Sequence, residues 1–292
     1  MMNYYIGLYF FKNKYDDLFT NKLIENIKIE ALKKNINIHF IHLDNDNYNK
    51  YNFNKIITKL DEIYLHNIVN NNIINFLTTN NQVRDPIKYQ YDIGNRLIMA
   101  DKLQNITVHV KNLFIPEYVY LEPGLEPYVL PKPVICKPIN CFGVNYAHDM
   151  CIINSDINIK QYITKPSLVQ HFYEHGGIIF KIYVIGKKYE IVIKNSVSLN
   201  DEIVYFNTGN IKNKALNLNN QEKNNLIINL LHDIDIPYLN MLINLHFGLT
   251  LFGYDIIKIN EQKYAIIDVN YLPGYKSMTN YLTYMTDYIL NN

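Results

Sequence analysis

The sequence has few of the residues that mark several functional classes. It contains no Trp and only two arginines, Arg84 and Arg96, so Lys must serve at most anion-binding positions. Its 28 basic and 27 acidic residues leave a formal net charge of +1. A dedicated nucleic-acid-binding protein normally carries a clear basic excess, so this balance argues against that class. A local basic pocket for a small anion remains compatible with it.

Cysteines and long apolar runs are also scarce. The 3 cysteines, Cys136, Cys141 and Cys151, are odd in number and form no C-x-x-C pair, which indicates a reducing compartment. No apolar run approaches the roughly 20 residues of a membrane span. Residues 4–11 are apolar but lack the basic region and the small-residue cleavage site that flank the core of a signal peptide. They are therefore predicted to form a buried strand. We therefore expect a cytoplasmic protein without membrane insertion. The sequence leaves the oligomeric state open, and nothing in it demands more than a monomer.

The first part of the chain predicts a parallel α/β unit. With 292 residues, the chain is long enough for two domains of about 150 residues each. Residues 4–11 and 36–43 have the composition and length of strands, and 16–35 has helical spacing between them. Tyr64-Leu65 lies in a third candidate strand. This strand–helix–strand order is typical of parallel sheets.

The second part predicts antiparallel α+β structure. A helix is expected at 93–104, and the five prolines of 115–133 predict an extended connector. Strand-like segments with short turns follow, interrupted by helices. The expected strands are 134–139, 149–154, 167–173, 178–185, 189–195, 251–259 and 264–271, and the expected helices are 220–232, 237–247 and 278–291.

A hairpin near the C-terminus carries the strongest chemical signal. Two apolar strands flank the polar turn 260–263. If the turn is centred on that segment, Asp255 lies opposite Asp268, and Asn270 projects from the same face two residues later. The pairs expected nearer the turn are Ile259 with Tyr264 and Ile257 with Ile266.

Two carboxylates at cross-strand distance in an apolar hairpin repel each other. A hard divalent cation removes the repulsion, and oxygen ligands suit Mg²⁺. Alternatively, the acids pair with nearby lysines or lie at a solvated strand end. Three oxygen ligands on one face, followed by a Pro-Gly turn, favour the metal site.

Two lysines interrupt apolar strands. Lys137 ends one strand and precedes the loop 139–146, whose backbone amides can cover phosphates, although a lysine at a strand end is common. Lys181 lies within an apolar run and needs a partner anion. His171 and His175 are four residues apart, but zinc would require a helix and further ligands, which the β-rich surroundings do not predict.

Taken in order, these segments resemble the inositol 1,3,4-trisphosphate 5/6-kinase family of the ATP-grasp superfamily. The matching pieces are Ile135–Pro138, His148–Met150, Gln170–Lys181, Leu251–Asp255 and Asp268–Tyr275. The resemblance implies an ATP-grasp fold. Its N-terminal, Rossmann-like substrate-side domain would be parallel α/β and span 1–92. Two antiparallel-sheet subdomains at 93–172 and 173–292 would clasp ATP, the second with the metal site.

The resemblance also implies roles for individual residues. The Mg²⁺ ligands would be Asp255, Asp268 and Asn270. The ATP contacts would be Arg96, Lys137, Gln170, His171, Phe172, Lys181, Ser198 and Thr208. The substrate contacts would be Lys14, Lys59, His148, Lys181, Asn270 and Gly274. The catalytic residues would be Lys137, Lys181 and Asp268. The serine assignment is open between Ser196 and Ser198, and Lys12 competes with Lys14.

The implied reaction is Mg²⁺-dependent transfer of the ATP γ-phosphate to the 5- or 6-hydroxyl of inositol 1,3,4-trisphosphate. The 1-hydroxyl of inositol 3,4,5,6-tetrakisphosphate is a second implied acceptor. One alternative is an ATP-grasp carboxylate–amine ligase, which commonly has Glu where Asp268 stands. Another is a non-catalytic sensor, which predicts the loss of a metal ligand, whereas all three are present. The sequence leaves the isomer, the accepting hydroxyl and any general base open.

Overall fold

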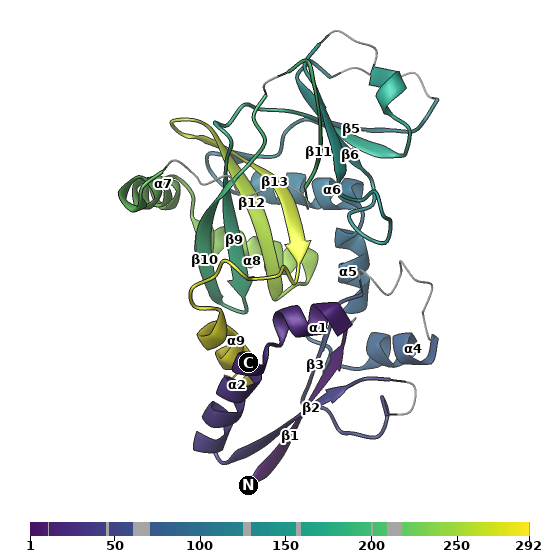
Figure 1. The fold of residues 1–292 in the computed structure, drawn as a ribbon, viewed down its shortest axis with the longest axis vertical. Helices are drawn as coiled ribbons and strands as arrows, with labels where there is room; N and C mark the ends of the chain where they lie inside the picture. The colour runs from purple at the N-terminus through teal and green to yellow at the C-terminus, as the bar shows by residue number, and fades with distance from the viewer. Residues whose placement is uncertain are drawn as a thin grey trace.

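Three sheets follow one another along the length of the molecule in the computed structural model (Figure 1). The structure describes residues 1–10, 12–44, 47–60, 71–124, 130–155, 159–199, 201–208 and 218–291, with the backbone alone at 12–14 and 160. The chain begins in the lowest sheet of the view, and its last helix returns to that sheet. The site described below lies between the other two sheets.

The N-terminal sheet is parallel, as the sequence predicts. It has the order β2-β1-β3 and consists of β1 (Met2–Tyr9), β2 (Ile36–His42) and β3 (Lys55–Thr58). The third strand is therefore Lys55–Thr58, a segment for which the sequence pattern predicts no strand or helix. The candidate at Tyr64-Leu65 lies outside the described residues.

The helix expected at 16–35 is two helices, α1 (Lys12–Leu18) and α2 (Asn21–Lys33). Thr20 caps α2, and its hydroxyl accepts a hydrogen bond from the amide of Leu23 at 3.3 Å. A capping residue inside a run of helical periodicity divides the run, and the hydrophobic spacing alone does not reveal it. The buried face of α2 consists of Leu23, Ile27 and Ala31.

Three further helices connect this sheet to the rest of the molecule: α4 (Asn71–Thr79), α5 (Ile87–Ile93) and α6 (Arg96–Thr107). The helix expected at 93–104 begins at Arg96 instead, because the Asn95 side chain accepts hydrogen bonds from the amides of Leu97 and Ile98. This cap places the first turn of α6 beside the candidate site.

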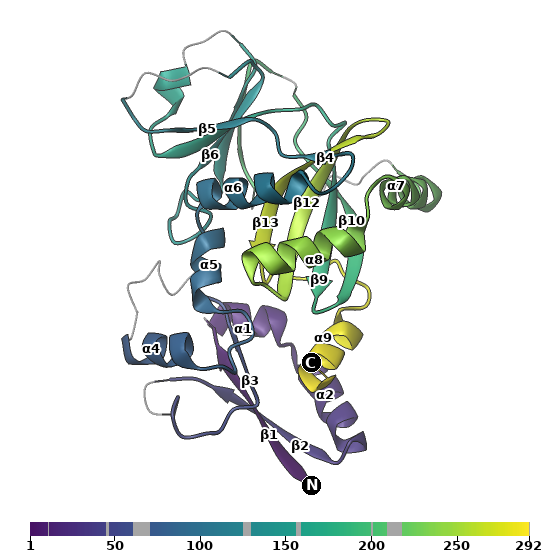
Figure 2. The same ribbon diagram turned by 180° about the vertical axis from the view of Figure 1, so that it is seen from behind.

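The middle sheet has the order β10-β9-β12-β13-β4 and is antiparallel apart from β4, which runs parallel to β13. Helix α8 lies across one face of it (Figure 2) and contributes to the largest buried hydrophobic cluster. The strands are β4 (Leu113–Phe114), β9 (Ile178–Ile185), β10 (Lys188–Asn195), β12 (Leu251–Asn260) and β13 (Lys263–Tyr271), and the helices are α7 (Asn220–Asp233), α8 (Ile236–Phe247) and α9 (Tyr281–Asn291).

The third sheet is antiparallel and has the order β11-β7-β6-β8-β5. Its strands are β5 (Tyr118–Leu121), β6 (Val134–Pro138), β7 (Asp149–Ile153), β8 (Ser167–His171) and β11 (Ile203–Asn207), with a 3₁₀ turn, η1, at Ile159–Tyr162. All seven strands expected from residue 134 onward are confirmed, within two residues at each end. Strand β5 lies within the proline-rich connector but at a sheet edge, where flanking prolines are tolerated.

Two strands pair across the expected boundary between 93–172 and 173–292. Strand β11 joins the third sheet by pairing with β7, and β4 joins the middle sheet by pairing with β13. Each short segment covers a strand edge that would otherwise present unpaired backbone groups. Pairings between distant segments of this kind leave little trace in local sequence.

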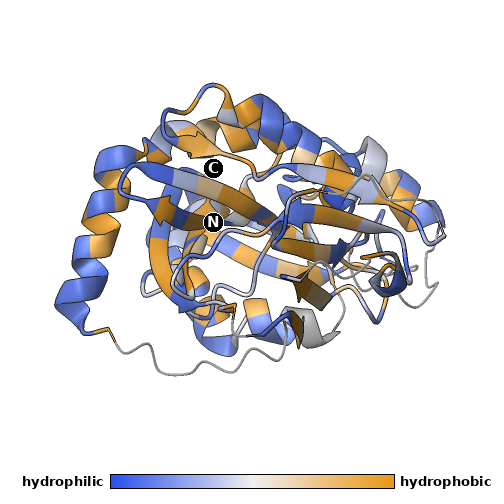
Figure 3. Cartoon of the chain, turned by 90° about the horizontal axis from the view of Figure 1, so that it is seen from above, coloured by the Kyte–Doolittle hydropathy of each residue, from blue (hydrophilic) through white to orange (hydrophobic). Residues whose placement is uncertain are grey.

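Hydrophobic residues concentrate in the strands, while the helices carry both hydrophilic and hydrophobic bands (Figure 3). Among the described residues, no single helix has the length and apolar composition of a membrane span. Helices α7 and α8 meet that criterion only when joined, and a bend of 67° separates them.

Candidate active site

The β12–β13 hairpin brings two carboxylates together. Asp255 lies opposite Asp268, as the sequence predicts, and Gly253 lies opposite Asn270. The expected pairs nearer the turn are wrong: the observed pairs are Ile256 with Ile266, Ile257 with Ala265 and Lys258 with Tyr264. Two irregularities shift the register by one residue and then restore it. Because the shifts cancel, the prediction for the acidic pair is correct.

Lys181 has the anionic partner that a lysine in an apolar strand requires. It pairs with Asp255 across β9 and β12, and its Nζ lies 2.8 Å from Asp255 Oδ1. Burial raises the pKa of the Asp255 carboxyl, Lys181 opposes the rise, and Asp268 adds to it. Burial alone would lower the pKa of Lys181, but the carboxylates of Asp255 and Asp268 outweigh it, so the pKa is raised.

The oxygen donors of the hairpin fit a hard divalent cation. Asp268 Oδ2 accepts a hydrogen bond from Asn270 Nδ2 at 2.9 Å, which places the carboxamide beside the acidic pair. The described part of the chain contains no group of three His, Cys, Asp or Glu side chains suited to a metal. Two carboxylates and one amide oxygen match the way Mg²⁺ is bound, through few protein ligands and with phosphates and water completing its shell.

Lys137 joins the third sheet to the middle sheet. Its side chain is buried, and its Nζ donates to Gln170 Oε1 at 2.8 Å and to the carbonyl of Ile267 at 3.1 Å. Burial lowers the pKa of Lys137 to about 8, although the charge of Asp268 opposes the change. The ammonium group is therefore held between the sheets, next to the acidic pair.

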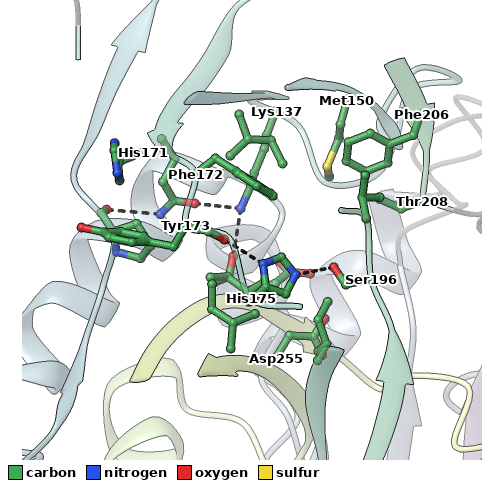
Figure 4. Close-up of a pocket in the computed structure, with 18 of the residues that line it drawn as sticks. Lys137, Met150, His171, Phe172, Tyr173, His175, Ser196, Phe206, Thr208 and Asp255 are labelled. Carbon is green, nitrogen blue, oxygen red and sulfur yellow. Dashed lines mark hydrogen bonds between the residues drawn. The ribbon is translucent and has the colours of Figure 1, made fainter. Parts of the chain in front are cut away.

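A mostly apolar inner pocket of 120 Å³ lies between these two sheets. In Figure 4, Lys137 extends from β6 toward the middle of the pocket, and Asp255 lies on the opposing sheet. Phe172 and Phe206 contribute aromatic walls. Gln170, His171 and Thr208 also line it. An apolar pocket with aromatic walls and a few polar groups suits a planar heterocyclic ring.

The two histidines of this region have protein partners, which disfavours a zinc site. His171 Nδ1 lies 2.9 Å from the carbonyl of Pro131. His175 contacts the carbonyl of Tyr173 through Nδ1 and Ser196 Oγ through Nε2, at 2.7 and 2.8 Å. Burial lowers the pKa of His175. Ser196 lines the inner pocket, whereas Ser198 Oγ lies against the turn at Gly177.

Arg96 holds the loop that follows Lys137. Its buried guanidinium donates to the carbonyls of Asn140 and Ala147, each at 3.1 Å, and also to that of Pro138. Its backbone amide donates to Ile139 at 2.8 Å. One planar group with several donors thus fixes both ends of a short loop. The geometry gives Arg96 a positioning role in addition to its place on the pocket wall.

Two more cavities continue the inner pocket past the acidic pair. A junction cavity of 340 Å³ shares Arg96, Met150, Ile179, Thr208, Asp255 and Asp268 with the inner pocket. An outer pocket of 180 Å³ shares Cys141, His148 and Asn270 with the junction cavity. The three spaces therefore form a continuous series, with the two carboxylates and Lys181 on the wall of the middle one.

The outer pocket receives two of the basic residues expected on the substrate side. Lys59 lines it and donates to the carbonyl of Leu272 at 2.8 Å. His148 is exposed, and its Nδ1 lies 3.0 Å from Thr208 Oγ1. The side chain of Lys14, in α1, lies outside the description. Gly274 is exposed and is absent from the described walls of the three cavities.

Sequence reasoning missed two residues that line these cavities. Cys141 lies between the outer pocket and the junction cavity, and burial raises the pKa of its thiol to about 11. The sequence indicates its role only through its position, four residues after Lys137 in the loop that is expected to cover phosphates. Gln90 lines the outer pocket from α5. No pattern in the sequence distinguishes it from other buried helix residues.

Comparisons with known proteins agree with this arrangement. The sequence model of the inositol 1,3,4-trisphosphate 5/6-kinase ATP-grasp domain matches residues 118–291. Inositol-tetrakisphosphate 1-kinase 1 of Arabidopsis thaliana is 32% identical over 172 residues, which are 54% of this chain and 54% of that protein. Inositol-tetrakisphosphate 1-kinase 2 of Glycine max is 26% identical over 232 residues, 73% of this chain and 72% of that protein. The matched region thus spans about half the length of the Arabidopsis relative.

Solved structures confirm the ATP-grasp fold. D-alanine–D-alanine ligase from Bacillus anthracis, complexed with ATP, matches with a TM-score of 0.55 at 11% identity, over 99% of this chain and 96% of that one. A RimK domain ATP-grasp protein from Sphaerobacter thermophilus matches with a TM-score of 0.55 at 10% identity, over 98% and 99% of the two chains. At these identities the likeness concerns the fold alone.

Proposed function

Because the chain belongs to the inositol 1,3,4-trisphosphate 5/6-kinase family, we propose that it is a Mg²⁺-dependent inositol polyphosphate kinase. The proposed acceptors are the 5- or 6-hydroxyl of inositol 1,3,4-trisphosphate and the 1-hydroxyl of inositol 3,4,5,6-tetrakisphosphate. The observation that carries the proposal is the continuous series of three cavities. An apolar slot for a nucleotide base leads to a carboxylate-lined junction and then to a basic outer pocket.

In this proposal ATP enters with its base in the inner pocket. Gln170, His171 and Phe172 line this pocket, and so does Lys137. The phosphates then extend into the junction cavity, where Lys181 and Lys194 form part of the wall. Lysines supply point charges here, in a chain with only two arginines.

Asp255, Asp268 and Asn270 would hold Mg²⁺, which would neutralise negative charge on the terminal phosphates. Lys181 already faces the same cavity beside Asp255 and would stabilise charge on the transferred group. Phosphoryl transfer of this kind passes through a loose transition state and depends mainly on positioning and charge neutralisation. A dedicated general base is therefore not required.

The outer pocket would hold the inositol phosphate. Lys59 lines it from the end of β3 in the N-terminal sheet, and His148 and Asn270 line it from the other two sheets. Substrate binding between separate parts of the fold would place the acceptor hydroxyl at the border with the junction cavity. Cys141 marks that border because it lines both spaces.

The first test is a product analysis. Purified protein is incubated with Mg²⁺, ATP and a panel of inositol tris- and tetrakisphosphates, and the products are resolved by isomer. The proposal predicts ADP and a product with one more phosphate, without any amine present. A ligase would instead leave every inositol phosphate unchanged and release ADP only with a carboxylate and an amine.

A variant pair tests the assignment of the outer pocket. Lys59→Ala should raise the KM for the inositol phosphate about tenfold, as expected for the loss of one charge-assisted contact. Lys28→Ala, on the exposed face of α2, is the matched control and should leave the KM unchanged. An unchanged KM in Lys59→Ala would remove this residue from the proposed acceptor site.

A further inference from the structure

Asp85 is the one acidic residue among the buried residues that the structure describes, with 2% of its surface exposed. Burial raises the pKa of its carboxyl to about 7, although hydrogen bonds from Thr250 oppose the rise. Within the described ranges, its Oδ2 is buried without a hydrogen bond. A carboxyl group is costly in such a place, so its presence calls for an explanation. No step of the proposed reaction uses it directly.

The side chain of Asp85 holds the start of β12. Its Oδ1 accepts hydrogen bonds from the amide and the hydroxyl of Thr250, at 2.5 and 2.8 Å. Thr250 directly precedes β12, and Asp255 lies on the same strand. Because β12 pairs with a strand on each side, its start and Asp255 are held in a fixed relation. Oδ1 can accept these bonds whether or not Oδ2 carries a proton.

The backbone next to Asp85 belongs to the N-terminal sheet. The amide of Arg84 donates to the carbonyl of Ile56 at 3.1 Å, and Ile56 lies in β3. Lys59 follows the last residue of β3 and lines the outer pocket. Asp85 therefore connects the strand that leads to Lys59 with the strand that carries Asp255.

Asp85 also fixes one wall of the outer pocket through its own carbonyl group. Gln90 Nε2 donates to that carbonyl at 2.8 Å and to Thr58 Oγ1 at 2.7 Å. Both hydrogens of the Gln90 amide group are thereby used, which sets the orientation of this side chain. Gln90 lines the outer pocket from α5, which lies between the N-terminal sheet and α6 (Figure 2). One residue thus contacts both a wall of the outer pocket and the start of β12.

Other contacts attach the N-terminal sheet to different parts of the molecule. Lys55 donates to two carbonyls of α9, and Lys59 donates to the carbonyl of Leu272 after β13. Tyr271 Oη donates to the carbonyl of Thr58 at 2.7 Å. These contacts keep the sheet attached to α9 and to the end of β13. Loss of the Asp85 side chain should therefore shift the sheet relative to β12 without detaching it.

We propose that Asp85 is a positioning residue for phosphoryl transfer: it holds the N-terminal sheet and α5 against β12 and so sets the position of the inositol phosphate relative to Asp255. The inference rests on the proposed function, because it assumes that the outer pocket binds the acceptor. A displacement of about 1 Å between reacting groups can cost about 100-fold in rate. Asp85 is absent from the described walls of the three cavities, so it acts through Gln90 and Thr250.

Hydrogen exchange of the full chain tests the contact itself, with or without turnover. In Asp85→Ala, the amides of residues 55–58 and 250–253 should exchange about tenfold faster than in the unsubstituted protein. Residues 134–138 of the third sheet should not change. Asp85→Asn keeps an acceptor oxygen for Thr250 and should restore most of the protection. Unchanged exchange in both segments of Asp85→Ala would overturn the proposal.

Kinetics test the effect on the proposed reaction. Asp85→Ala should raise the KM for the inositol phosphate about tenfold, and Asp85→Asn should recover most of this loss. The dissociation constant of ATP should stay the same, because the inner pocket lies between the other two sheets. Asp92→Ala removes an acid that pairs with Lys102 and is the matched control, with no change expected.

The outcomes separate positioning from a general folding defect. A folding defect would lower kcat through a smaller active fraction and leave the KM for the inositol phosphate unchanged, which would overturn the proposal. Equal losses of affinity for ATP and for the inositol phosphate would also overturn it. If the unsubstituted protein turned over no inositol phosphate, the proposed function would fail, and hydrogen exchange alone would decide whether Asp85 holds the two parts together.

Variants of Thr250 cover the case in which Asp85→Ala does not fold. Thr250→Val removes the hydroxyl that donates to Asp85 and should raise the KM for the inositol phosphate about threefold, whereas Thr250→Ser should leave it unchanged. Tyr288 Oη lies 2.6 Å from the Thr250 hydroxyl, so Tyr288→Phe tests whether that neighbouring contact causes the effect. It should leave the KM unchanged. Equal KM values in Thr250→Val and Thr250→Ser would contradict the role of Asp85.

Discussion

The ammonium group of Lys181 lies 2.8 Å from the carboxylate of Asp255, on the neighbouring strand of the same sheet. Both side chains are largely buried, with exposed fractions of 16% and 15%. Asp268 lies on the other side of Asp255, so three charged groups follow one another across β9, β12 and β13. One positive charge therefore faces two negative charges, a balance that a bound cation would change.

Removing Lys181 should leave a buried carboxylate without its partner. We expect Lys181→Met to lower the free energy of unfolding by about 3 kcal/mol in Mg²⁺-free buffer, since breaking a buried ion pair exposes the cost of the remaining charge. Adding Mg²⁺ should stabilise this variant more than the unsubstituted protein. Urea unfolding with and without Mg²⁺ measures both effects, and an equal Mg²⁺ response in the two proteins would contradict the proposed metal site.

Substitution of Asp268 should lower kinase activity without lowering folding stability. Asp268→Ala should reduce kcat of the proposed kinase by at least about 100-fold, because loss of metal-assisted charge stabilisation amounts to several kcal/mol. In Mg²⁺-free buffer its folding stability should be equal or higher, since a repulsive carboxylate pair is gone. Asp201→Ala, at an exposed position, is the control. Full activity in Asp268→Ala would show that the metal is held by other residues.

Arg96 should act on nucleotide binding through the loop it holds. Arg96→Lys keeps the charge, but one ammonium group cannot reproduce the fork that reaches Asn140 and Ala147. We expect the KM for ATP to rise about tenfold, with a stability loss of about 1–3 kcal/mol from the unsatisfied carbonyls. Steady-state kinetics and thermal unfolding measure the two effects. A kcat decrease without any change in KM or stability would instead indicate direct contact with the reacting groups.

Lys55 should make folding stability depend on pH. Burial lowers its pKa to about 7 in the folded protein, from an ordinary value of 10.5, with the charge of Arg84 adding to the effect. Between these two values the unfolded chain binds more protons than the folded one, so this residue makes the free energy of unfolding rise with pH across that window. Lys55→Met should remove that rise, as measured by urea unfolding at pH 7 and 10. An identical pH dependence in both proteins would mean that Lys55 remains charged when buried.

The sequence predicted the parts of the fold that depend on local periodicity. The seven strands expected from residue 134 onward and the three helices after residue 219 were predictable because apolar spacing repeats within each segment. The break at Thr20 and the start of α6 at Arg96 depend on single capping side chains, which the periodicity does not reveal. Strands β4 and β11 arise from pairing between distant segments, so no local pattern marks them.

Two features of the candidate site were predicted correctly from the sequence: the Asp255–Asp268 pair and an anionic partner for Lys181. Asp255 and Asp268 face each other because two register shifts cancel, which the alternating pattern could not show. The partner of Lys181 followed from the cost of an isolated buried charge. Gln90 and Cys141 reach the cavities only through the tertiary arrangement of α5 and the loop after β6.

The packing of α9 on α2 has a consequence for how the chain folds during synthesis. Asn26 of α2 donates to Thr286 of α9 at 2.9 Å, and Lys55 of β3 binds the carbonyls of Tyr288 and Ile289. The N-terminal sheet thus leaves the ribosome before the other two sheets, but part of its cover comes from residues 281–291. Until those residues are translated, its apolar surface needs another cover, so the nascent chain should depend on chaperones longer than its position in the sequence suggests.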